Sequence, residues 1–174
     1  MAVEKKVSEL PTTSTAPQPT DVVVGDISGT TYKINFNQLA LMPVNGGLGN
    51  GYYMGLGFVG FNAGEDLTQW DVVYLHSSGW KKAKANTAGL WPSRGLVIST
   101  VSSGNAATVL HLGVVRNTGW SWSAVNVSLY LSETAGGLSE SAPGTTGACI
   151  QVVGFATGAT EASFNFTGVY AEHI

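Results

Sequence analysis

The chain has 174 residues, with 11 acidic and 8 basic side chains and a formal net charge of −3. Charged residues make up only 11% of the sequence, against about 25% in typical soluble domains. So little positive charge gives no basic surface for nucleic acid, and no apolar run approaches the ~18 residues of a membrane-spanning helix. The single cysteine, Cys149, excludes an internal disulfide and a cysteine-based metal site.

Residues 1–20 are predicted to form a flexible arm. Pro11, Pro17 and Pro19 stand among threonines and serines, and such a segment has little apolar surface to bury. The arm lacks the apolar stretch of a secretory leader, so we expect the protein to be made in a cytoplasm and to work without a leader.

Residues 21–42 are predicted to form a small β module. Apolar residues alternate with polar ones there, which is typical of half-buried strands. The apolar positions that define the module are Val22, Val24, Tyr32, Ile34 and Phe36.

Residues 43–66 combine many glycines with large aromatic and aliphatic side chains. Flexible linkers contain few large apolar residues. The segment is therefore predicted to be an extended connector packed against its neighbours, in which glycine allows backbones to approach closely.

Residues 67–174 contain short apolar runs separated by turn signals at intervals of about ten to twenty residues. This pattern predicts an all-β domain, either a short-stranded barrel or a sandwich. The expected strands lie near residues 71–75, 80–83, 95–101, 107–115, 125–131, 149–155 and 162–170.

Two series of segments resemble bacteriophage virion proteins. Residues 7–11, 21–24 and 31–36, in this order and spacing, resemble the N-terminal module of phage fibre proteins. The later segments resemble phage capsid-decoration and fibre-head domains, and they are 71–75, 80–86, 95–98, 113–115 and 130–156. The resemblance implies a trimeric virion appendage that attaches to the particle through residues 21–42; it does not account for residues 43–66.

Tryptophans supply the first candidate site. Trp120 and Trp122 are expected on one face of a strand, where they either stack on a host glycan or form part of the core or a subunit interface. Trp91 is a further candidate for the same roles. Burial in a core or an interface is the favoured alternative, because the surrounding sequence offers few polar partners for sugar hydroxyls.

Other chemistry finds little support in the sequence. His111 is a candidate axial residue in a trimer, against the alternative of a histidine bonded to backbone. The glycines at 55, 57 and 60 match the spacing of a dinucleotide-binding motif. The sequence after them predicts neither the helix nor the acidic residue that this motif requires. A glycosidase pair of Asp66 or Asp71 with Glu133 is conceivable, but we expect no enzymatic activity and no cofactor or metal.

The sequence therefore predicts a structural, non-enzymatic phage virion protein, made in the host cytoplasm and trimeric. Its expected role is capsid decoration or head fibre. The alternatives are a tail-fibre or receptor-binding tip that recognises a host surface glycan, and a free carbohydrate-binding module.

Overall fold

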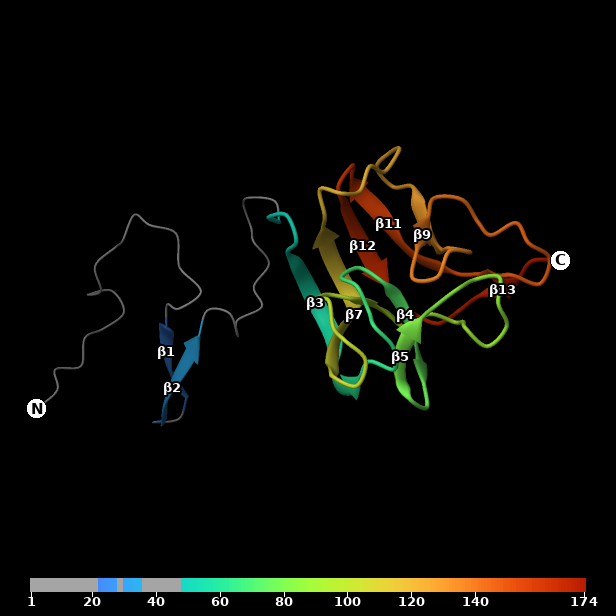
Figure 1. Ribbon diagram of the computed structural model, residues 1–174. Coiled ribbons are helices and arrows are strands. Elements are labelled where there is room, and N and C mark those ends of the chain that lie inside the picture. The colour runs from blue at the N-terminus through green and yellow to red at the C-terminus, as the bar shows by residue number, and fades with distance from the viewer. Residues whose placement is uncertain (1–21, 28–29, 36–47) are drawn as a thin grey trace, which may run out of the picture. The chain divides into compact units, whose positions relative to one another are not determined.

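The computed structural model describes residues 22–27, 30–35 and 48–174 (Figure 1). Contacts divide the chain into two compact units, Met1–Met42 and Pro43–Ile174. The predicted arm, residues 1–20, lies outside the described residues. No helix in the described part of the chain is long and apolar enough to span a membrane.

In the first unit the structure describes the backbone of two strands. β1 (Val22–Ile27) pairs with β2 (Thr30–Asn35) in an antiparallel ladder that joins Val22 to Asn35 and Ile27 to Thr30. Among the predicted attachment residues, those at positions 22 and 24 lie on β1 and those at 32 and 34 on β2. Phe36 lies outside the described residues.

The second unit consists of strands joined by turns, with no helix among its described residues 48–174, and the all-β prediction is confirmed. Nine strands form one curled antiparallel sheet that closes half of a barrel, in the order β5-β4-β6-β7-β12-β11-β8-β9 with β3 added alongside β7. β10 and β13 form a separate small sheet. The strands are β3 (Tyr53–Asn62), β4 (Val72–His76), β5 (Gly79–Lys82), β6 (Gly95–Val97), β7 (Ala106–Arg116), β8 (Ser128–Leu131), β9 (Leu138–Ser139), β10 (Cys149–Ile150), β11 (Val152–Gly158), β12 (Glu161–Asn165) and β13 (Ala171–Glu172).

β7 is the strand around which the sheet is built. One of its edges pairs with β3 along nearly its whole length, and its other edge is shared by β6 and β12. The register with β3 shifts between Leu56, which faces Leu112, and Gly57, which faces Leu110. His111 is therefore an extra residue, and such a bulge turns the following side chains to the other face of the strand.

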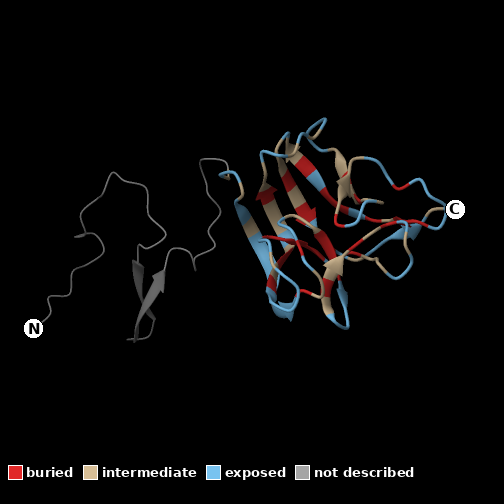
Figure 2. Cartoon of the chain, in the orientation of Figure 1, coloured by how far each residue is buried: buried red, intermediate tan, exposed pale blue. Residues whose placement is uncertain are grey.

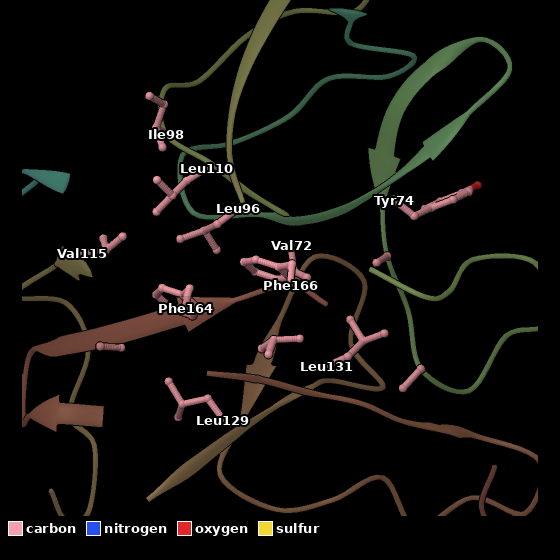
Figure 3. Close-up of a cluster of buried hydrophobic side chains, with 14 residues drawn as sticks. Val72, Tyr74, Leu96, Ile98, Leu110, Val115, Leu129, Leu131, Phe164 and Phe166 are labelled. Carbon is pink, nitrogen blue, oxygen red and sulfur yellow. The ribbon is translucent and has the colours of Figure 1, made fainter. Parts of the chain in front are cut away.

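β7 contributes to two separate cores, one on each face of the sheet. Leu110 and Val115 pack in the larger core, together with Phe164 and Phe166, whose rings stack 5.8 Å apart (Figure 3). Val109 packs on the opposite face in a smaller core around Trp80. Adjacent strand residues point to opposite faces, so this part of the sheet is buried on both sides.

A buried polar contact ties the small-sheet region to the loop before β6. Gln151 is fully buried between β10 and β11. Its Oε1 accepts hydrogen bonds from the backbone N–H and the hydroxyl of Ser93, both at 2.8 Å, and its Nε2 donates to the Ser93 carbonyl at 3.0 Å. Both the oxygen and the nitrogen of the amide are hydrogen-bonded, as is usual for buried polar groups.

Candidate functional site

Part of the outer side of the curled sheet is uncharged and is here called the apolar sheet face; the charged ladder pair Arg116 and Glu161 borders it in an adjacent row. One row of ladder partners crosses four strands from β11 to β3, and it consists of Phe155, Ser163, Val114 and Met54. The next row joins Asn165, Leu112 and Leu56. Cross-strand partners lie on the same face of a sheet. These seven residues therefore form one continuous patch without a formal charge.

Large side chains in this patch are open to solvent. Leu56 is 70% exposed, Phe155 44% and Leu112 42%, and Figure 2 shows β3 as an exposed strand beside strands with buried residues. Val115 follows Val114 on β7, and Phe164 lies between Ser163 and Asn165 on β12. Both are fully buried in the larger core. The alternation that buries one face thus leaves apolar residues on the other, where a soluble sheet normally carries polar ones.

The edge of this surface is also open. β3 pairs with β7 on one side and has no strand on its other side among the described residues. Its ten residues, Tyr53–Asn62, contain no charge and no proline. Charged residues and prolines usually protect an edge strand from pairing with another chain. The two register shifts in its ladder with β7 disfavour a long continuous pairing with a further strand, so the edge is better suited to side-chain packing.

Glycines allow β3 to approach β7 closely. Gly55 and Gly113 are ladder partners. A Cβ on Gly113 would overlap the carbonyl oxygen of Met54 and lie 2.9 Å from Cα of Gly55. Backbone atoms cannot move aside as a side-chain end can, so only glycine fits this position of the ladder.

A second candidate site is a pocket of about 480 Å³ formed by three segments distant in sequence. Trp70 precedes β4, Trp120 and Trp122 lie in the loop between β7 and β8, and residues 136–140 surround β9. The prediction that Trp120 and Trp122 lie on a strand is wrong, because their segment is a loop. Their rings are nevertheless neighbours, with centroids 5.3 Å apart.

The three tryptophans are partly buried and pack against the larger core. Trp120 is central: its ring centroid lies 6.0 Å from that of Trp70 and 6.0 Å from that of Phe164, which meets it edge-on. Trp70 adopts a left-handed backbone conformation with φ of 75°. For a bulky residue this conformation costs about 1–3 kcal/mol, so the surrounding structure holds Trp70 in place.

Trp91 does not line this pocket. It is partly buried against the larger core, and its ring meets Tyr170 edge-on at 5.0 Å. The indole N–H groups of Trp91 and Trp122 are both buried and have no acceptor among the described residues. Trp91 thus shares its environment with the pocket tryptophans without lining the pocket.

His111 has a backbone partner. Its Nδ1 lies 3.0 Å from the carbonyl oxygen of Arg94, and its ring meets Phe58 edge-on at 5.2 Å. An axial position of His111 in a trimer stays a prediction. Among the described residues no group of three or more histidine, cysteine or carboxylate side chains is arranged to hold a metal ion.

The carboxylates considered for a glycosidase pair each stabilise a turn. Asp66 accepts a hydrogen bond from the Ser103 N–H at 2.8 Å, and Asp71 forms an ion pair with Lys82 at 3.2 Å. Glu133 accepts from the N–H groups of Gly144 and Thr145 at 3.0 and 2.9 Å. The Thr145 N–H is the main cause of the lowered pKa of Glu133.

Cys149 has no reactive environment. The residue is fully buried in β10, and desolvation raises the pKa of its thiol to about 11. The nucleophilic form of cysteine is the thiolate, which this environment disfavours.

Sequence reasoning missed Trp70 and Glu140 as pocket residues. Trp70 lies some fifty residues before Trp120, and Glu140 follows β9 in a polar stretch with no local signal. Comparisons of the chain with protein-family models, with curated proteins and with solved structures found no match.

Proposed function

We propose that this chain is a structural, non-enzymatic protein of a bacteriophage virion, assembled as a homotrimer and attached to the particle through its N-terminal unit. The proposed role is capsid decoration or head fibre. The observation that carries the proposal is the apolar sheet face next to the open edge of β3. Monomeric proteins rarely expose large contiguous apolar patches, so this surface favours a protein that functions in an assembly.

The chemistry of the face favours a second copy of the same chain as its neighbour. A charged partner would leave its charges unpaired against seven uncharged residues, whereas identical uncharged surfaces meet without repulsion. In a closed ring of three copies the open edge of each β3 is covered by a neighbour.

The phage assignment is supported by the resemblance of residues 7–36 and 71–156 to virion appendages. Within the second unit, residues 130–156 run from β8 through β9 and β10 into β11. Two of its residues shape turns: Gly136 has a left-handed φ of 72°, and Glu133 binds the backbone of the loop at Gly144. These contacts support a structural role for the stretch.

Two measurements test the proposal. Light scattering of the purified chain should give the mass of a trimer. Electron microscopy of phage particles from a lysate, labelled with antibody against this chain, should place the label on the head. A monomer at micromolar concentration would overturn the homotrimer, and particles free of label would overturn the virion role.

A receptor-binding tip is the second candidate function. The tryptophan pocket favours it, because aromatic rings beside polar groups are suited to a sugar. Label at the tail instead of the head would support this second candidate over decoration.

A further inference from the structure

We propose that the pocket between Trp70, Trp120, Trp122 and the β8–β9 hairpin binds a neutral sugar in its pyranose form. The inference is independent of the proposed virion role, since both a decoration protein and a receptor-binding tip can carry such a site. A volume of about 480 Å³ falls within the about 300–1,000 Å³ of typical small-molecule sites.

The first argument is the rigidity of the aromatic wall. Trp120 is held between Trp70, Trp122 and the core residue Phe164, with ring centroids 5.3 to 6.0 Å away. Trp70 is held in a strained left-handed conformation, and strain of this kind gathers at binding sites. Rings already fixed in place lose little conformational entropy when a ligand stacks on them.

The second argument is the polar side of the pocket. Glu140 lines it, and one carboxylate oxygen, Oε1, accepts the Ser123 N–H at 2.6 Å and so fixes the side chain. The other oxygen, Oε2, has no partner among the described residues. Ser121 also lines the pocket, whereas the hydroxyl of the lining residue Ser139 is bonded to the Ser141 backbone. An oriented carboxylate oxygen beside a serine hydroxyl matches the donors and acceptors of a sugar.

The charges of the lining select a neutral ligand. Glu140 is the only charged residue that lines the pocket, so an acidic sugar would meet repulsion and no compensating cation. A quaternary ammonium group is the competing ligand, since it also binds tryptophan beside a carboxylate. However, the Trp120 ring packs against both of the others, at tilts of 56° to Trp70 and 42° to Trp122. They form a wall rather than a cage with room for a cation between them.

The experiment titrates the full-length chain with maltotriose, cellotriose, triacetylchitotriose and choline, and follows tryptophan fluorescence and calorimetric heat. At least one trisaccharide should bind saturably at millimolar concentration or below. Glu140→Gln, which keeps an oxygen for the Ser123 N–H, and Trp122→Ala should each weaken that binding by about tenfold or more.

Trp91→Ala is the matched control, because Trp91 is equally part of the core boundary but lies outside the pocket; it should bind the sugar as the wild type does. If Trp122→Ala does not fold, Glu140→Gln decides alone. The proposal is overturned if no trisaccharide binds, if choline alone binds, or if Glu140→Gln binds with unchanged affinity.

Discussion

Leu56 of β3 and Leu112 of β7 are ladder partners on the outer side of the sheet, and their side chains are 70% and 42% exposed. Two large aliphatic residues that face each other and solvent gain little from folding of one chain. In the proposed trimer a neighbouring molecule buries them.

Replacing both leucines by serine should therefore separate the copies without unfolding them. We expect the Leu56→Ser, Leu112→Ser variant to be monomeric by light scattering where the wild type is a trimer. Its free energy of unfolding, extrapolated to infinite dilution of the subunits, should stay within about 1 kcal/mol of the isolated wild-type subunit.

Val125→Ser is the control, because Val125 is 69% exposed in the loop between β7 and β8 and is not one of the seven residues of the apolar sheet face. It should keep the wild-type mass. An unchanged mass of the double leucine variant would show that this face is not the subunit interface.

The close approach of β3 and β7 depends on Gly113. In Gly113→Ala the new Cβ would overlap backbone atoms of Met54 and Gly55, so we expect a loss of about 1–3 kcal/mol in the free energy of unfolding. Hydrogen exchange should become faster along Tyr53–Asn62. Gly144→Ala, where a Cβ meets nothing within 4 Å, should leave both measurements unchanged.

Gln151 and Ser93 offer a graded test of the buried polar contact. Gln151→Leu leaves the buried N–H and carbonyl of Ser93 without partners, and each unsatisfied group costs about 1–3 kcal/mol. Ser93→Ala removes only the hydroxyl bond and should cost about 1 kcal/mol. Urea denaturation of the two variants measures the difference; equal losses would contradict this account.

Acid should weaken the loop that Glu133 holds. Hydrogen bonds from the Thr145 and Gly144 backbone lower the pKa of Glu133, so its contribution to stability is complete above the pKa of an unfolded glutamate, about 4.3. It is lost as the pH falls through the lower folded value. Wild type should therefore lose more stability than Glu133→Gln on acidification; parallel pH profiles would count against this role.

The fold class was readable from the sequence because alternation and turn residues are local signals. The long strand predicted near residues 107–115 is β7, and the run at 71–75 corresponds to β4. The predicted single strand at 149–155 is instead two, β10 and β11, because Gln151 turns inward to Ser93. The apolar run around Gln151 contains no local signal for a hydrogen bond to Ser93, which lies 58 positions away.

The candidate sites were harder to predict from the sequence than the fold class, because they depend on residues that only the fold brings together. Trp120 and Trp122 are two positions apart in the sequence, whereas Trp70 and Glu140 join them only through β4 and the β8–β9 hairpin. The apolar sheet face is also a product of register, since the pairing of Leu56 with Leu112 requires the bulge at His111.

The separation of β3 from β7 along the chain has a consequence for synthesis on the ribosome. β7 begins at Ala106, 44 residues after β3 ends at Asn62, so β3 emerges about 2–9 seconds before its partner at ordinary elongation rates. During this interval an uncharged apolar strand is exposed to neighbouring nascent copies. The glycines at 55, 57 and 60 lower its tendency to stack into fibrils. They therefore protect the unfinished chain as well as fit the finished sheet.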